Sequence, residues 1–168
     1  MRHSLTILPA FAVGLMMGTL GLPINSAGAA GCSEQLFKDY YAGWSHDMPK
    51  LMTTYADDVV HEDKTVNANL HGKKAVEDFA QSWFKAFPDL NLTPNSVILA
   101  DNRGTAEWIA TGTQKGDMPG MPASNKLMKI PGVSVFECSD GKISHVVEYW
   151  DMATVMRQLG FLAAPKTK

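Results

Sequence analysis

The chain has 168 residues, a formal net charge of -2 and 45% apolar residues, which is typical of one ordinary globular domain rather than a disordered or fibrous chain. Its 15 basic residues are balanced by 17 acidic ones. Lysine and arginine never cluster beyond a pair, so the charge pattern favours neither nucleic acid nor an anionic membrane surface as a partner.

The N-terminus has the layout of a cleaved signal peptide over residues 1–29. Arg2 and His3 precede an apolar stretch over residues 5–20, and residues 27–29 form a small-x-small cleavage site. A membrane anchor is the alternative, but glycine and proline interrupt the apolar run. We therefore expect an exported protein, periplasmic or secreted, with one domain at residues 32–163 and no membrane span in the mature chain.

Three helices are predicted at the start of the mature domain. The first begins after Ser33 as N-cap, and the second begins after Asp47 and ends near Tyr55. The third ends at Pro88 and has apolar residues at i, i+3, i+4, i+7, i+8 and i+11, a spacing that predicts one face packed on a sheet. The residues of this face are Val76, Phe79, Ala80, Trp83, Phe84 and Phe87.

Strands are predicted over most of the remaining chain. A short strand at residues 59–61 leads through Asp63 into a loop that ends at Gly72. After residue 90, turns separate four longer strands, and Pro131 is expected to shorten or bulge the third. Asp151 then opens a short closing helix. The four longer strands are predicted at residues 95–100, 105–115, 127–138 and 142–150.

Helices followed by a meandering sheet give an α+β fold class. The expected architecture is a cone-shaped barrel, in which a curved and mainly antiparallel sheet wraps around the N-terminal helices and a short helix closes the C-terminus. Such a cone leaves a cavity that binds either a small apolar molecule or nothing.

Several short motifs in the right order resemble the SnoaL-like polyketide cyclases of the nuclear-transport-factor-2-like superfamily. They include Tyr-Ala-Asp-Asp at residues 55–58, Ala-Phe-Pro-Asp-Leu at 86–90, Asp-Gly-Lys-Ile at 140–143 and Gln-Leu-Gly at 158–160. The resemblance implies ring closure by intramolecular aldol condensation without a metal or organic cofactor. It also implies an acid/base role for Asp151. Family members often carry His where this chain has Gln114, and Glu where it has His145.

Asp151 and His145 are the candidate catalytic residues. Period-two alternation on the last strand places both on one face, with Ser144, Val146 and Glu148 on the other. An aspartate directly before a helix is equally well explained as an N-cap. His145 could likewise be an ordinary surface or core histidine.

Six further residues are candidate substrate-binding groups. Trp108 could form an aromatic wall for a planar ligand, and Gln114 could orient that ligand through its amide. Core packing is the competing explanation. The remaining members are Tyr40, Trp44, Tyr55 and His61. We do not interpret His61 with its two acidic neighbours as a metal site, because consecutive strand residues point to opposite faces and no second cluster offers ligands.

The two cysteines, Cys32 and Cys138, are predicted to form a disulfide, because export brings the chain into an oxidising compartment. Acylation of Cys32, as in a lipoprotein, is the alternative.

Two classes of function remain open. The first is a cofactor-free cyclase or isomerase for a hydrophobic carbonyl compound. The second is a non-catalytic module that binds a small ligand or takes part in assembly, including assembly as a homodimer.

Overall fold

The computed structural model describes residues 31–163. The predicted signal peptide lies outside these residues. Within them the helices are α1 (Glu34–Trp44), α2 (Met48–Thr54), α3 (Lys73–Ala86) and α4 (Met152–Leu159). The strands are β1 (Tyr55–Asp63), β2 (Ala68–His71), β3 (Asn91–Ala100), β4 (Arg103–Thr113), β5 (Leu127–Ser139) and β6 (Lys142–Trp150).

Local sequence explains where the helices begin and end. The Ser33 side chain accepts a hydrogen bond from the Leu36 amide, and the Asp47 side chain accepts one from the Lys50 amide. The α3 helix stops two residues before Pro88, which cannot continue a helix. All three helices therefore occur where the sequence predicts them.

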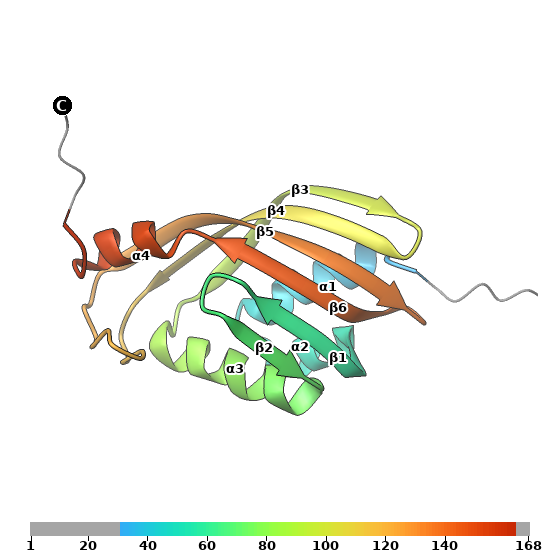
Figure 1. Cartoon of the computed structure of the whole chain (residues 1–168), viewed down its shortest axis with the longest axis horizontal. Coiled ribbons are helices and arrows are strands. Elements are labelled where there is room, and N and C mark those ends of the chain that lie inside the picture. Colours follow the sequence, from blue (N-terminus) through green and yellow to red (C-terminus); the bar gives the residue numbers. More distant parts are fainter. Residues whose placement is uncertain (1–30, 164–168) are drawn as a thin grey trace, which may run out of the picture.

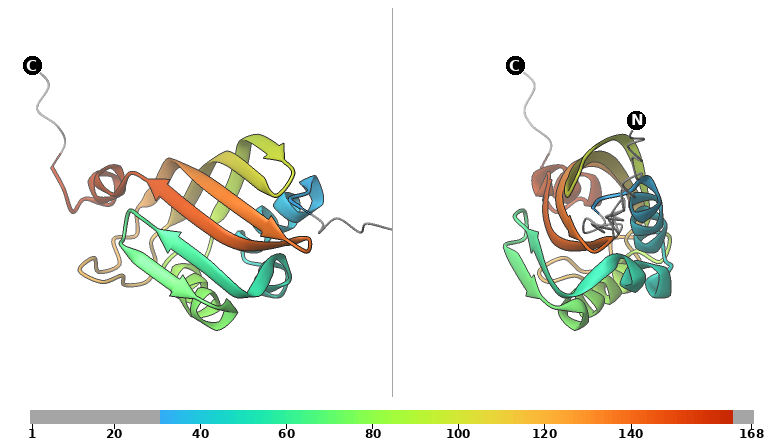
Figure 2. Two further views of the ribbon diagram at one scale, coloured as in Figure 1. Left: turned by 45° about the vertical axis from the view of Figure 1, so that its right-hand side comes forward. Right: turned by 90° about the vertical axis from the view of Figure 1, so that its right-hand side faces the viewer.

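The strands form one curved sheet in the order β2-β1-β6-β5-β4-β3. Neighbouring strands are antiparallel except β1 and β6, which are parallel. The sheet curls around α1, α2 and α3, which close its concave side (Figures 1 and 2). This is the predicted α+β cone.

Two local predictions were wrong. The expected loop between Asp63 and Gly72 contains β2, because Asn67 adopts a positive φ of 54° and the chain turns back to pair with β1. Pro131 neither shortens nor bulges β5, whose pairing with β4 is continuous. The β6 strand pairs with β5 only from Gly132 onwards, so Pro131 lies where one side of β5 is unpaired and proline is tolerated.

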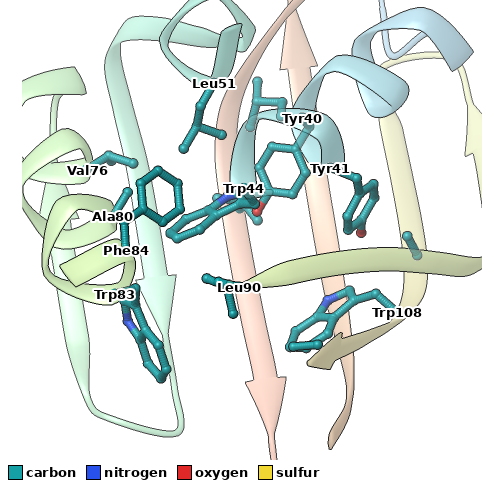
Figure 3. Close-up of a cluster of buried hydrophobic side chains, with 14 of the residues drawn as sticks. Tyr40, Tyr41, Trp44, Leu51, Val76, Ala80, Trp83, Phe84, Leu90 and Trp108 are labelled. Carbon is teal, nitrogen blue, oxygen red and sulfur yellow. The ribbon is translucent and has the colours of Figure 1, made fainter. Parts of the chain in front are cut away.

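The core lies between the concave face of the sheet and the helices. Even-numbered residues of β4 and β5 point inward and are buried. The α3 helix lies against β1, β2 and α2, and Trp83 on its predicted face and Phe87 at its end are buried. Figure 3 shows Trp44 between the buried side chains of α3 and Tyr40. A disulfide joins Cys32 to Cys138 with 5.2 Å between their Cα atoms. The predicted pairing is thus present, and it fastens the start of α1 to the end of β5.

Candidate functional site: two buried carboxylates in the cone

Glu148 lies at the centre of a buried polar network. It is the inward residue between Val146 and Trp150 on β6, and its side chain is 9% exposed. One carboxylate oxygen, Oε1, accepts hydrogen bonds from Tyr40 Oη at 2.7 Å and Ser134 Oγ at 3.0 Å. The other, Oε2, lies 3.5 Å from His61 Nε2. Three elements therefore converge on one carboxylate.

Sheet register brings these partners together. Ser134 on β5 is directly opposite Glu148 on β6, and His61 on β1 is opposite Val146 on β6. Trp108 Nε1 donates to Ser134 Oγ at 2.8 Å, which leaves the serine hydrogen to donate to Glu148. The Trp108 indole fits because its neighbour on β5 is Gly132, where a Cβ would lie 2.2 Å from the ring.

The surroundings of Glu148 favour its ionised form. Burial alone would raise its pKa, but the His61 imidazole and the hydroxyls of Tyr40 and Ser134 hold the pKa below the ordinary glutamate value. Burial, reinforced by the nearby Glu148 charge, raises the pKa of Tyr40 well above 10, so this hydroxyl remains a donor.

Asp63 is the second buried carboxylate, 2% exposed at the end of β1. Its Oδ2 accepts a hydrogen bond from Trp150 Nε1 at 2.8 Å, and its Oδ1 accepts from the Thr65 amide at 2.9 Å. Burial raises the pKa of Asp63 in spite of these donors, and the charge on Glu148 raises it further. The two carboxylates are thus shifted in opposite directions.

Asp63 and Glu148 line the same inner cavity, which has a volume of about 40 Å³. Aromatic and aliphatic side chains form the rest of its wall. They are Trp44, Phe79, Trp83, Leu90, Leu92, Ala110, Met128, Ile130 and Trp150. Trp44, Trp83 and Leu90 are visible together in Figure 3.

An outer pocket of about 450 Å³ adjoins the inner cavity and shares Phe79 and Trp83 with it. The shared aromatic residues therefore separate a small acidic chamber from a larger apolar one. The other side chains of the outer pocket are Val66, Ala68, Ser82, Met118, Pro119, Met121 and Met152.

Five of the six predicted binding residues lie in or around the inner site. Trp44 lines the cavity, while Tyr40 and Trp108 belong to the Glu148 network. Tyr55 Oη lies 3.2 Å from His61 Nδ1. Within the described residues, Tyr41 Oη, Trp44 Nε1 and His61 Nε2 are buried without a hydrogen-bond partner of good geometry. Such buried polar atoms mark the interior as a polar site rather than a dry core.

Gln114 is buried at the base of the loop that precedes β5. Its Nε2 donates to the Met121 carbonyl at 3.0 Å, and its Oε1 accepts from the Ser124 amide at 3.2 Å. Its amide therefore holds the loop that carries Met118 and Met121 of the outer pocket.

The structure does not bring Asp151 and His145 together, and neither lines the inner cavity or the outer pocket. Asp151 is exposed and caps α4, where hydrogen bonds from Thr154 lower its pKa. His145 lies on the other side of the sheet, with its Nε2 2.9 Å from Glu62 Oε1.

The sequence interpretation missed Asp63 and Glu148. The sequence carried no signal for Glu148, because alternation groups it with Ser144, Val146 and Trp150, a set that is no more apolar than the opposite one. Asp63 shares the face of buried His61 two residues earlier. Within residues 31–163 no group of three or more histidine, cysteine or acidic side chains could hold a metal ion.

Comparison with known proteins shows what the chain is similar to. The model of the SnoaL-like polyketide cyclase family matches residues 34–159. None of the curated proteins compared with the sequence matches it.

Solved structures share the fold at low identity. A candidate polyketide cyclase from Pseudomonas putida is 24% identical, with a TM-score of 0.68 over 73% of this chain and 94% of that one. TsrD from Streptomyces laurentii is 23% identical, with a TM-score of 0.69 over 76% and 94%. A protein of ketosteroid isomerase-like fold from Catenulispora acidiphila, solved in complex with trimethylamine, is 18% identical, with a TM-score of 0.68 over 79% and 99%.

Proposed function

Since the chain belongs to the SnoaL-like polyketide cyclase family, we propose that it is a cofactor-independent cyclase or isomerase that acts on a hydrophobic carbonyl compound by acid/base proton transfer. The observation that carries this proposal is the pair of carboxylates in one cavity with pKa values shifted in opposite directions. Environments that separate the pKa values of two neighbouring acids are a mark of acid/base sites.

Asp63 is the proposed proton-transfer group. Its raised pKa brings the carboxylate closer to the basicity needed to remove a proton from a carbon next to a carbonyl. The proton moves to a carboxylate oxygen, and the electron pair of the broken C–H bond forms the enolate. An isomerase returns this proton to another carbon of the conjugated system. In a cyclase the enolate carbon attacks a second carbonyl, and the new alkoxide takes the proton.

The outer pocket suits the apolar body of such a substrate. Its lining holds no charged side chain, and its three methionines can adapt to an irregular shape. The inner cavity has room for only a small reacting part of the molecule. The proposed ligand is therefore a hydrophobic small molecule that enters past Phe79 and Trp83.

A variant series tests this proposal. A panel of cyclic ketones and β-diketones is incubated with the protein in D₂O, and proton NMR follows exchange at the carbon next to the carbonyl. We expect Asp63→Asn to slow the catalysed exchange by about 10²-fold or more, because the proton acceptor is lost. Asp58→Asn is the matched control, since Asp58 lies exposed on the same strand.

The catalytic role that the resemblance implies for Asp151 stays a prediction, and the same assay separates it from the role of Asp63. Asparagine is also a good N-cap, so Asp151→Asn keeps the start of α4 intact. A loss of exchange in Asp151→Asn with full activity in Asp63→Asn would contradict the assignment made above.

A non-catalytic binding or assembly module is the alternative function. Exchange no faster than in buffer for every ketone of the panel would favour it. Catalysed exchange whose rate rises with pH as Asp63 ionises would instead favour the enzyme. A protein that only binds the ketone catalyses no exchange, so it has no rate that could depend on pH.

A homodimer and export complete the proposal. Ile98, Val135 and Tyr149 are 64%, 44% and 52% exposed on the convex face of the sheet, and a second copy could cover them. Sedimentation velocity should then show a dimer that Val135→Lys dissociates.

The disulfide is compatible with an oxidising compartment, and the mass of the protein secreted by its host tests cleavage after Ala29. Within residues 31–163, no helix is both long and apolar enough to cross a membrane.

A further inference from the structure

Four aromatic rings of the inner cavity stand approximately at right angles to one another. Trp44 and Phe79 have ring centroids 6.5 Å apart and an interplanar angle of 80°. Phe79 and Trp83 follow at 6.3 Å and 69°, and Trp83 and Trp150 at 5.6 Å and 83°. All four line the cavity. They form an aromatic box, in which faces and edges alternate around a small space.

The charges around the aromatic box are acidic. Asp63 and Glu148 line the cavity, and its lining includes no lysine or arginine. The basic side chain that faces this pair is His61, whose Nε2 lies 3.5 Å from Glu148 Oε2. Among residues 31–163 Asp63 has no basic partner, because its hydrogen-bond donors are the Trp150 indole and two backbone amides. Asp63 therefore keeps an uncompensated negative charge whenever it is ionised.

Aromatic faces and carboxylates attract the same kind of ligand. The face of an aromatic ring is negative and binds a cation, most strongly when water is excluded, and quaternary ammonium groups are recognised in this way. The cavity of about 40 Å³ has room for about three or four water-sized groups, which matches the methyl groups of an alkylated ammonium head. A phosphate or carboxylate head would be repelled by both acids.

We propose that the aromatic box binds the N-methylated ammonium group of a small molecule, with the remainder of that molecule in the methionine-lined outer pocket. This inference rests on the proposed function only in taking the inner cavity as the ligand site. It does not require that the bound molecule undergo a reaction. The aromatic rings supply the cation-binding faces, and Asp63, fixed by the Trp150 indole, supplies the counter-charge.

Isothermal titration calorimetry of the full mature protein tests the inference with a matched pair of probes. Choline carries a permanent positive charge, and 3,3-dimethylbutan-1-ol has the same shape with a neutral carbon in place of nitrogen. We expect choline to bind at least about ten-fold more tightly than the alcohol at neutral pH, the margin that desolvated cation–π contacts provide. Equal affinities, or no binding of choline, would overturn the proposal.

Variants assign the binding to the aromatic box. Asp63→Asn and Trp44→Leu should each weaken choline binding about ten-fold and bring it close to that of the alcohol. Asp58→Asn, which removes an exposed charge of the same strand, should leave it unchanged. Trp150→Phe keeps a ring face but loses the hydrogen bond to Asp63, so a smaller loss is expected, and circular dichroism establishes that each variant is folded. Choline binding that survives Asp63→Asn, Trp44→Leu and Trp150→Phe would overturn the proposal.

The same preparations separate this inference from the proposed function. Exchange on the ketone panel without choline binding would overturn the ammonium site and leave the acid/base function standing. Choline binding without exchange would support the ammonium site and favour a binding module over an enzyme.

Discussion

At the scale of single residues, Glu148 shows how a charge is tolerated inside a small cone. An unpaired buried carboxylate would be very costly, and it is retained only when hydrogen bonds and a basic neighbour replace the lost water. Tyr40, Ser134 and His61 provide this replacement from three different elements. Each partner should therefore contribute measurably to stability.

Tyr40→Phe should lower the free energy of unfolding by about 1.5 to 3 kcal/mol, because it removes a hydrogen bond to a buried charged group. Urea denaturation monitored by circular dichroism measures the change. Tyr149→Phe is the control, since Tyr149 is 52% exposed on β6, and it should change stability by less than about 0.5 kcal/mol. Equal effects of the two variants would show that the Tyr40 hydroxyl contributes nothing to holding Glu148.

The pKa of Glu148 predicts an acid-sensitive part of the stability. Its folded-state pKa lies below the ordinary value of 4.5, so the unfolded chain binds more protons in acid. Glu148 therefore stabilises the fold above pH 4.5, and this contribution is lost as pH falls from 4.5 through the folded-state value. Asp63 acts in the opposite direction, because its raised pKa makes ionisation costly as pH rises above 3.8.

Urea titrations between pH 7 and pH 3 should accordingly show a flatter acid dependence for Glu148→Gln than for the wild type. Glu107→Gln, on the exposed face of β4, should keep the wild-type dependence. A Glu148→Gln curve parallel to the wild-type curve would mean that the folded protein does not lower this pKa.

At the scale of elements, α3 joins the fold to the site. One face of the helix buries Val76, Ala80 and Phe84, and Trp83 stacks on Phe87 with 5.6 Å between ring centroids. Trp83 also meets Trp150 edge to face across the cavity. The same helix therefore provides core packing and a wall of the aromatic box.

Trp83→Ala should cost about 3 to 5 kcal/mol of unfolding free energy, the usual loss when a large buried aromatic side chain is truncated. Ser82→Ala on the exposed neighbouring position is the matched control and should cost less than about 0.5 kcal/mol. Chemical denaturation measures both. A loss below about 1 kcal/mol for Trp83→Ala would contradict the packing of α3 on the sheet.

At the scale of the whole molecule, the disulfide links segments that are 106 residues apart. Cys32 precedes α1, and its amide donates to the Asp101 carbonyl at 2.9 Å in the turn between β3 and β4. Cys138 lies at the far end of β5. The link therefore fastens the first helix to the sheet at the end opposite the outer pocket.

The double variant Cys32→Ala/Cys138→Ala should lose about 2 to 4 kcal/mol of unfolding free energy, with about 4.7 kcal/mol as the chain-entropy limit for a loop of this length. Thermal and urea unfolding measure the loss. Reducing agent should destabilise the wild type by a similar amount and leave the double variant unchanged. Two free thiols in the purified protein, detected by mass spectrometry, would contradict the pairing.

The order of elements follows from local patterns in the sequence, whereas the site depends on tertiary contacts. The capping residues Ser33, Asp47 and Asp151, and the apolar spacing of α3, act within one or two turns and can be read without a structure. Asp63 and Glu148 are 85 positions apart, and they share a cavity because β1 runs parallel to β6 within the curled sheet and places Asp63 directly opposite Glu148. The bulge between Glu137 and Cys138 changes the register at the start of β6, and only the folded sheet shows that Glu148 points inward while His145 points outward. Non-local pairing thus decided which acid is buried, and burial in turn decided its pKa.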